Sequence, residues 1–384
     1  MHITDDIRYV GVNDHDIDLF EGLYPVPNGV AYNSYVIMDE KVAVMDAVDA
    51  HFGGLWLTNV REVLGDRQPD FLIVQHMEPD HSSSIALFLT AFPEAIVVAS
   101  AKAFPMMKAF FGEDYASRRI IVKEGDVLCL GKHTLSFVAA PMVHWPEVIM
   151  TYDQTDKVFF SADAFGKFGA LDAEEDWACE ARRYYFGIVG KYGAQAQSVL
   201  KKAAALDIQT ICPLHGPVLA GDALTNALSL YNTWTAYQPE NEGVTIVHAS
   251  VYGNTRAAAE KLAADLEAKG VKVAIHDLNR CDVAEAVEDA FRYDRLVMAC
   301  ATYNADVFPP MKTFMNWLTE RGYRNRTVGI IENGSWAPMA GKIMRTTMES
   351  CKDMTILEPV VKIQSALNEE SSAQLNTLCN ALIG

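Results

Sequence analysis

Six consecutive residues, His76-Met77-Glu78-Pro79-Asp80-His81, include four side chains that can bind a metal ion. An apolar run at 71–75 precedes them and three serines at 82–84 follow. This order is typical of a buried strand, a tight turn stiffened by its proline, and a helix that the serines could cap. Four ionisable groups beside a buried strand are costly unless something compensates them, so the pattern predicts a metal centre.

Three further ligand types follow apolar, strand-like segments later in the chain, at His144, Asp163 and His215. They raise the candidate set to four histidines and three carboxylates: His76, Glu78, Asp80, His81, His144, Asp163 and His215. Seven ligands are too many for one tetrahedral zinc ion. They suit two divalent ions with one bridging carboxylate, because three carboxylates and a bridging hydroxide would balance four positive charges.

The six other histidines show no such pattern. His2, His15, His51, His133 and His276 lie in polar or turn-like segments, and His248 ends an apolar strand. We expect ordinary packing or hydrogen-bonding roles for all six.

Three loops in the C-terminal part have the composition of a ligand-binding site, and the first of them is suited to bind a phosphate group. Ser250-Val251-Tyr252-Gly253-Asn254-Thr255 joins an apolar strand to a helix, and hydroxyls and backbone N–H groups at a helix start bind anions. The loop has no lysine or arginine, and G-x-x-x-x-G-K-[ST] is absent. Two more loops follow later strands, where an open parallel sheet binds its ligand: Ala301-Thr302-Tyr303-Asn304-Ala305-Asp306 and Asn333-Gly334-Ser335-Trp336-Ala337-Pro338.

The predicted strands and helices that must position these residues follow a different order in the two parts of the chain. The first part is rich in short strands, including 31–38, 42–46, 95–99 and 134–140, with helices near 55–64, 101–111 and within 176–206. After 244 the pattern becomes regular, with five strands near 244–247, 273–275, 295–299, 327–331 and 356–361 alternating with five helices. The polar segment Trp234–Gly243 is the predicted linker, which gives domains at 1–240 and 244–384.

Composition limits the classes of function. The net charge of −18 over 384 residues argues against nucleic-acid binding. No apolar run is long enough to span a bilayer, and the first residues do not resemble a signal peptide. The seven cysteines are scattered and never spaced C-x-x-C, which predicts reduced thiols and a cytoplasmic protein.

The order of the ligands resembles the metallo-β-lactamase superfamily, whose hydrolases carry H-x-H-x-D-H and bind zinc. Glu78 stands where those hydrolases have the second histidine, and this substitution resembles the flavodiiron proteins, also called A-type flavoproteins. Four other segments carry the same resemblance: 31–35 (AYNSY), 140–146 (APMVHWP), 163–166 (DAFG) and 180–185 (EARRYY). The resemblance implies an α/β multidomain fold, with an N-terminal αββα metallo-β-lactamase-like sandwich and a C-terminal flavodoxin-like, doubly wound, five-stranded parallel sheet.

The same resemblance implies two iron ions and FMN. His76, Glu78 and His144 would hold one iron, and Asp80, His81 and His215 the other, with Asp163 between them. Some members of the family leave the histidine at the place of His81 unligated, and both arrangements stay open. In the second domain the loop 250–255 would bind the FMN phosphate. Thr302, Tyr303 and Asn304 would meet the flavin ring, and Trp336 would stack on it or flank it, although the loop lacks the family's glycine-rich pattern.

The resulting hypothesis is an oxidoreductase that reduces O2 to water or NO to N2O. Tyr192 and Trp145 would line the diiron cavity, where core packing is an equal alternative. No rubredoxin-type C-x-x-C module follows, so we expect an external donor, either rubredoxin, another small carrier or coenzyme F420. The resemblance implies a head-to-tail homodimer or a dimer of dimers. Two alternatives stay open: a zinc hydrolase fused to a flavodoxin, and an electron-transfer flavoprotein whose first domain is a metal-free scaffold.

Overall fold

A computed structural model describes residues 3–383 of the chain. Backbone contacts divide it into two compact units, Met1–Asn232 and Thr233–Gly384. This division lies earlier in the chain than the linker expected at Trp234–Gly243. Among the described residues, no helix is both long enough and apolar enough to cross a membrane.

The first unit is built from two six-stranded sheets. The first sheet has the order β1-β6-β7-β8-β9-β10 and is parallel from β7 to β10. Its strands are β1 (Ile7–Tyr9), β6 (Tyr35–Ile37), β7 (Ala43–Met45), β8 (Phe71–Val74), β9 (Ile96–Ser100) and β10 (Arg119–Val122). The second sheet runs in chain order and is antiparallel except for the parallel β14–β15 pair. Its strands are β11 (Val127–Cys129), β12 (Thr134–Ala139), β13 (Ile149–Asp153), β14 (Val158–Phe160), β15 (Thr210–Cys212) and β16 (Leu219–Ala220).

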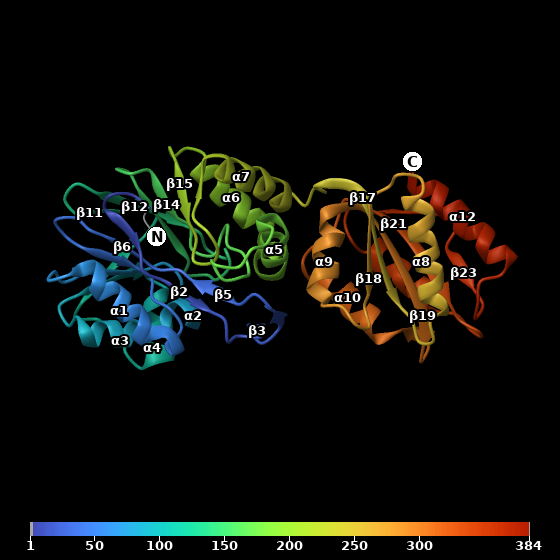
Figure 1. The fold of residues 1–384 in the computed structure, drawn as a ribbon, viewed down its shortest axis with the longest axis horizontal. Helices are drawn as coiled ribbons and strands as arrows, with labels where there is room; N and C mark the ends of the chain where they lie inside the picture. The colour runs from blue at the N-terminus through green and yellow to red at the C-terminus, as the bar shows by residue number, and fades with distance from the viewer. Residues whose placement is uncertain (1–2, 384) are drawn as a thin grey trace. The chain divides into compact units, whose positions relative to one another are not determined.

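Helices cover the outer faces of both sheets. Figure 1 shows α1, α3 and α4 gathered on one side and α6 and α7 on the other, which is the expected αββα arrangement. The core between the sheets joins Met45 and Ile73 of one sheet to Phe137 and Phe160 of the other. The helices of this unit are α1 (Gly53–Leu64), α2 (Pro79–Ser82), α3 (Ile85–Ala91), α4 (Ala103–Phe111), α5 (Trp177–Tyr184), α6 (Gly193–Ala203) and α7 (Gly221–Thr235), with the short turns η1 (Ala50–Phe52), η2 (Tyr185–Val189) and η3 (Gly190–Tyr192).

The strand expected at 31–38 is wrong, because it is broken in the middle. β5 (Val30–Tyr32) pairs with β2 (Val12–Asp14), whereas β6 begins at Tyr35. At the break, the Asn33 amide donates to the carbonyls of Pro213 and Gly216, at 2.9 and 2.8 Å. This polar junction holds the loop that carries His215. A small hairpin of β3 (Leu19–Phe20) and β4 (Tyr24–Pro25) precedes it.

The helix α7 was not expected from the sequence. It buries Leu224, Ala227, Tyr231 and Trp234, which recur every three or four residues on one face. Because α7 continues to Thr235 and the next strand begins at Asn241, the expected linker is shortened to the residues between them.

Tyr237, which lies in this short connection, is held by the second unit. Its carbonyl accepts a hydrogen bond of 2.9 Å from the buried guanidinium of Arg326. Arg324 lies over its ring at 4.0 Å from the centroid. The start of the second unit is therefore fixed by contacts within that unit.

The second unit is a parallel sheet in the order β18-β17-β19-β21-β22, with α8 and α12 on one face and α9 and α10 on the other (Figure 1). The fifth strand, expected at 356–361, is instead split into two pieces that pair with different parts of β21. A short antiparallel strand, β20, also pairs with β19. The strands are β17 (Asn241–Ala249), β18 (Val273–Asp277), β19 (Tyr293–Tyr303), β20 (Asp306–Val307), β21 (Thr327–Asn333), β22 (Thr355–Ile356) and β23 (Val361–Ile363). The helices are α8 (Asn254–Glu267), α9 (Val283–Arg292), α10 (Pro309–Glu320), α11 (Ala340–Glu349) and α12 (Glu369–Ile383).

Candidate functional site

The turn after β8 is fixed at its start by hydrogen bonds to Asp46 and at its end by Pro79. The buried Asp46 carboxylate accepts hydrogen bonds from the Gln75 backbone N–H at 2.7 Å and from the Gln75 amide at 2.8 Å. Pro79 then begins the single-turn helix α2, where its fixed φ suits the first helical position. The expected serine cap is wrong: Ser84 occupies the N-cap of α3 without capping it, and its hydroxyl donates to the Asp49 carbonyl.

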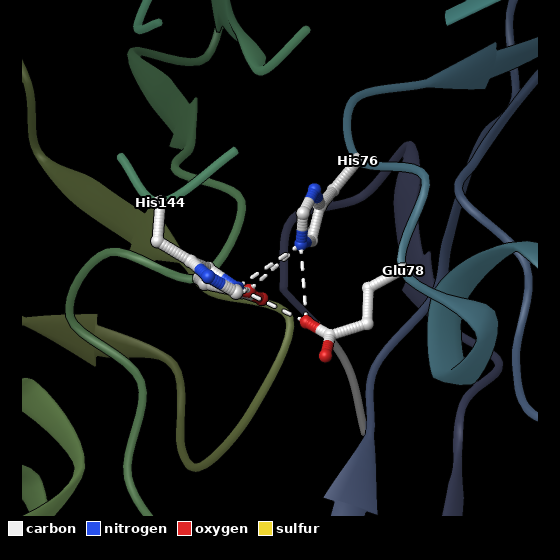
Figure 2. Close-up of side chains that lie close together, drawn as sticks. His76, Glu78 and His144 are labelled. Carbon is white, nitrogen blue, oxygen red and sulfur yellow. Dashed lines mark hydrogen bonds and ion pairs between the residues drawn. The ribbon is translucent and has the colours of Figure 1, made fainter. Parts of the chain in front are cut away.

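The first cluster of ligand atoms contains His76, Glu78, His144 and Asp163, all of them buried. Figure 2 shows three of these side chains pointing toward one another. His76 Nε2 and His144 Nε2 are 3.2 Å apart, and Glu78 Oε2 lies 3.3 and 3.0 Å from them. Asp163 Oδ2 completes the group, at 2.9 Å from His144 Nε2 and 3.2 Å from His76 Nε2.

The second cluster contains Asp80, His81 and His215. The two Nε2 atoms are 2.9 Å apart, and Asp80 Oδ2 lies 3.3 Å from each. Asp163 again lies beside the group, but through its other oxygen: Oδ1 is 3.4 Å from His81 Nε2 and 3.8 Å from His215 Nε2. One carboxylate therefore presents one oxygen to each cluster.

The donor set fits two metal ions. Donor atoms that surround one ion at about 2.1 Å lie roughly 3.0–3.4 Å apart, which is close to the separations in both clusters. Paired imidazole nitrogens at such distances need a cation or a shared proton between them. In addition, both oxygens of Asp80 and the Oδ1 of Asp163 lack a hydrogen-bond partner among residues 3–383. Buried polar atoms are rarely left in this state, and bound cations would satisfy them.

Opposite charges hold the cluster together before any metal binds. Burial alone would lower the pKa of His144, but Asp163 and Glu78 outweigh it and raise that pKa to about 9. Burial would likewise raise the pKa of Asp163, yet the surrounding histidines hold it well below its usual range. His144 is thus paired as a cation with these carboxylates, and a metal ion must displace its proton.

Residues behind the ligands orient some of them. Glu147 was not singled out from the sequence, yet its buried Oε1 accepts hydrogen bonds from His76 Nδ1 at 2.8 Å and from the Met77 N–H at 2.9 Å. His215 Nδ1 donates to the Ala31 carbonyl at 2.8 Å. Both contacts turn Nε2 toward the cluster. His81 differs, because its Nδ1 has no hydrogen-bond partner among residues 3–383.

Aromatic rings form the walls of the centre. The Trp145 ring centroid lies 5.2 Å from that of His76, and its role in shaping the cavity stays a prediction. Phe20, from the β3–β4 hairpin, packs edge-on against His215 at 5.3 Å. Tyr192 is half-buried and makes no hydrogen bond or ring contact with the ligand residues within the described chain, so its role stays a prediction.

Tyr184 and Tyr32 both contact His215 of the second cluster, with the Tyr32 ring 6.1 Å from that of His215. Tyr184 is the one whose hydroxyl is left without a partner within residues 3–383. Its ring lies 5.5 Å from that of His215, and its buried hydroxyl has no hydrogen-bond partner among the described residues. Burial, then the charges of Asp163 and Glu78, raise the pKa of Tyr184, so the hydroxyl keeps its proton. Tyr185, Phe186 and Tyr192 follow closely in the sequence, and the contact with His215 identifies Tyr184 among them.

Glu21, in the turn of the β3–β4 hairpin, is a second residue that sequence reasoning missed. Its carboxyl group contacts that of Glu78. Partial removal from water and the charge of Glu78 raise the pKa of Glu21 to about 7, although the side chain is exposed. The hairpin therefore places a protonatable group beside a ligand.

Most other histidines have ordinary partners, in line with expectation. His133 is buried between Asp153 and Asp6, at 2.9 and 3.1 Å, and these carboxylates outweigh burial to raise its pKa to about 9. His248 is buried, and its Nδ1 lacks a hydrogen-bond partner among residues 3–383. His2 lies outside the described residues.

The second unit contains a cavity of about 580 Å³ at the carboxyl ends of β17, β19 and β21. Its size and position suit a flavin mononucleotide. Of the residues expected at the flavin, these line it: Ser250, Val251, Tyr252, Asn254, Thr255, Thr302, Tyr303, Asn304, Ala305, Gly334, Ser335 and Trp336. Gly253 does not line this cavity, and Asp306 points away to an ion pair with Lys312 at 2.6 Å.

Two contacts organise the flavin loops. Thr302 was expected to meet the ring through backbone and side chain, which stays a prediction. Its hydroxyl oxygen accepts hydrogen bonds from the N–H groups of Met339 and Ala340 and so caps α11. Ser365, which follows β23, lines the cavity and was missed from the sequence. Its hydroxyl lies 2.6 Å from that of Ser335, and its backbone pairs with the Asn333 amide.

Comparison with known proteins identifies a family for each of the two units. The model of the ODP family β-lactamase matches residues 30–216, and the flavodoxin model matches 246–373. The chain is 27% identical to a nitric oxide reductase of Moorella thermoacetica, over 94% of this chain and 92% of that protein. It is 25% identical to a rubredoxin-oxygen oxidoreductase of Megalodesulfovibrio gigas, over 99% and 96%.

Solved structures give the same result over the whole length. The rubredoxin oxygen:oxidoreductase from Desulfovibrio gigas superposes with a TM-score of 0.90 at 25% identity and covers 99% of this chain and 98% of its own. A flavodiiron protein from Giardia intestinalis gives 0.87 at 25% identity, with 99% and 94% covered. With a lactamase-like unit that presents two sets of metal donors and a flavodoxin unit with a flavin-sized cavity, the chain belongs to the flavodiiron proteins.

Proposed function

We propose that this chain is an oxidoreductase that uses FMN and a non-haem diiron centre to reduce O2 to water, NO to N2O, or both. The observation that carries the proposal is the position of Asp163, whose two oxygens face separate clusters, each with a histidine pair. The names of the two relatives, a nitric oxide reductase and a rubredoxin-oxygen oxidoreductase, support both gases as substrates.

In this proposal His76, Glu78 and His144 hold one iron, and Asp80, His81 and His215 the other, with Asp163 between them. Bound iron supplies one-electron chemistry at two adjacent ions, and FMN supplies electrons to it. A carboxylate in place of a third histidine makes the first cluster richer in oxygen, which favours iron over the zinc of a hydrolase.

The remaining residues control water and protons. The rings of Trp145 and Phe20 cover the ligands and limit the access of water. Tyr184 keeps its proton on Oη and has no competing hydrogen-bond partner among residues 3–383, so it suits a donor of a hydrogen bond to a small substrate. Tyr192 was predicted to line the diiron cavity, and we propose that Tyr184 also lines it.

The proposal includes an external electron donor of the rubredoxin type, with another small carrier or coenzyme F420 as the alternative, and a head-to-tail dimer. Trp336 and Tyr303, at the edge of the flavin cavity, are 82% and 44% exposed, which supports coverage of this edge by another molecule. No disulfide joins the seven cysteines within residues 3–383, which supports a reducing compartment such as the cytoplasm.

Anaerobic reduction followed by separate additions of O2 and NO tests the function. We expect the reduced protein to contain about two irons and one FMN per chain and to be reoxidised by at least one gas. Reoxidation by one gas alone would identify the preferred substrate. Zinc without iron would favour the fused hydrolase, and flavin reduction without any bound metal would favour the electron-transfer module. Either result, or failure of both gases to reoxidise the iron, would refute the proposal.

A further inference from the structure

A second cavity, of about 210 Å³, lies beside the loop 250–255. It is also lined by Asp277 at the end of β18, by Asn279 and Arg280 after that strand, and by Arg256 from the first turn of α8. The Asn279 amide donates to the Ser250 carbonyl at 2.9 Å, which ties the segment after β18 to the loop. The cavity is therefore formed by contacts within one unit. It shares Ser250, Val251 and Tyr252 with the flavin cavity, whereas Gly253, Arg256, Asp277, Asn279 and Arg280 line it alone.

The cavity carries positive charge in an acidic protein. Arg256 and Arg280 both line it, whereas the whole chain has a net charge of −18. Arg280 forms no ion pair within residues 3–383, and Arg256 has only a loose, exposed contact of 3.5 Å with Glu260. One guanidinium nitrogen of Arg256 lies 3.8 Å from the place where a Cβ on Gly253 would be, so the charge lies beside the loop. Two guanidinium groups at one cavity favour an oxyanion such as phosphate.

A carboxylate stands beside the arginines. Asp277 ends β18, the strand that neighbours β17, and its side chain is 27% exposed. Its Oδ1 accepts a hydrogen bond from the Asn279 N–H, which leaves Oδ2 for a ligand. A carboxylate repels an anion but binds a pair of hydroxyls. In dinucleotide-binding folds an acidic residue at the equivalent strand end binds the ribose, and a nearby arginine accommodates a ribose phosphate.

An exposed ring completes the site. Tyr252 lines the cavity and is 94% exposed, which is unusual for a large aromatic side chain. The cavity is too small for a whole nucleotide, but the ring offers a surface outside it on which a base can stack.

We propose that this cavity binds the ribosyl phosphate part of a nucleotide, with the phosphate on Arg256 and Arg280, the ribose hydroxyls on Asp277 and the base on Tyr252. The ligand can be a free adenine nucleotide or the adenosine half of a nicotinamide dinucleotide, because both have the same ribosyl phosphate. The inference does not depend on the iron chemistry.

Calorimetric titration of the FMN-loaded protein tests the proposal, with AMP, NADPH and inorganic phosphate as probes and oxygen excluded. We expect saturable binding of AMP at one site per chain, at least tenfold tighter than inorganic phosphate. Tighter binding of NADPH than of AMP would identify a dinucleotide, and equal binding a free nucleotide. Absence of saturable binding at millimolar AMP, or release of FMN on binding, would overturn the proposal.

Three variants separate the contributions. Arg280→Ala should weaken AMP and phosphate alike, by about tenfold or more. Asp277→Asn should weaken AMP but leave phosphate unchanged or tighter, since it removes the hydroxyl acceptor and a repelling charge. The matched control Lys261→Ala removes a positive charge from α8, the helix that carries Arg256, outside the cavity, and should change the affinity for neither AMP nor phosphate. Flavin content monitors folding in each variant, and AMP binding that survives both pocket substitutions would refute the site.

Discussion

Replacing Glu147 with glutamine should weaken metal binding at the cluster that contains His76. Glu147 Oε1 accepts the His76 Nδ1–H and the Met77 N–H, at 2.8 and 2.9 Å, and its side chain is fully buried. Glutamine has the same shape, so it keeps one acceptor oxygen but loses the negative charge. The imidazole ring then keeps its orientation and becomes a poorer electron donor through Nε2.

The expected magnitude follows from two effects. Loss of a carboxylate behind a ligating histidine lowers metal affinity about 10–100-fold, which is about 1.4–2.7 kcal/mol. The new NH2 group would occupy the position of Oε2, which has no hydrogen-bond partner among residues 3–383. A buried donor left unpaired costs about 1–3 kcal/mol of folding stability. The variant should therefore bind iron more weakly at the cluster that contains His76, and it should also unfold at a lower temperature.

The assay is anaerobic competition for Fe(II) between the protein and a coloured chelator, with flavin content measured in the same samples. Glu124→Gln is the matched control, because Glu124 lies half exposed on the surface, paired with Lys202 at 2.7 Å. It should leave iron affinity unchanged. If Glu147→Gln bound both irons as tightly as the unchanged protein, the role assigned to Glu147 would be wrong.

Three further predictions concern the two cofactor sites. Asp163→Ala should release both irons together and abolish gas reduction with FMN retained, measured by iron and flavin content; full iron content would exclude bridging. Thr255→Ala removes a buried hydroxyl at the phosphate loop and should weaken FMN about tenfold without changing iron content, as flavin titration would show. Iron uptake should release protons, because the pKa of His144 is raised to about 9 without metal and the ring is protonated at pH 7. Apparent iron affinity should then fall as pH falls below about 9, and calorimetry in two buffers of different ionisation enthalpy would count the protons; uptake without proton release would contradict the charge assignment.

Local spacing predicted the parts of the site that lie within one segment. His76, Glu78 and Asp80 alternate along a turn that follows a buried strand, so local spacing alone places all three at the same end of that strand. The loop 250–255 was likewise recognisable, because an anion site at a helix start needs only consecutive residues. The five-position parallel sheet followed from regular alternation of strands and helices.

The parts that the sequence did not reveal depend on contacts between distant residues. Glu147 is identified only by His76, which lies 71 positions earlier. The break at Asn33 follows from hydrogen bonds to carbonyls about 180 positions away. Tyr184 and Tyr192 are both aromatic residues in a helical segment, and only the ring contact with His215 distinguishes them. No periodicity or propensity contains this information.

The cap that Thr302 places on α11 has a consequence for how the flavin loops can vary. One hydroxyl oxygen, from Thr302 near the end of β19, accepts hydrogen bonds from the N–H groups of Met339 and Ala340, where the loop after β21 ends and α11 begins. The two loops therefore cannot rearrange separately, and a substitution at Thr302 alone would free both. We expect these two segments to vary together among homologous sequences. A hydroxyl residue at the position of Thr302 should then be accompanied by a helix that begins at the position of α11.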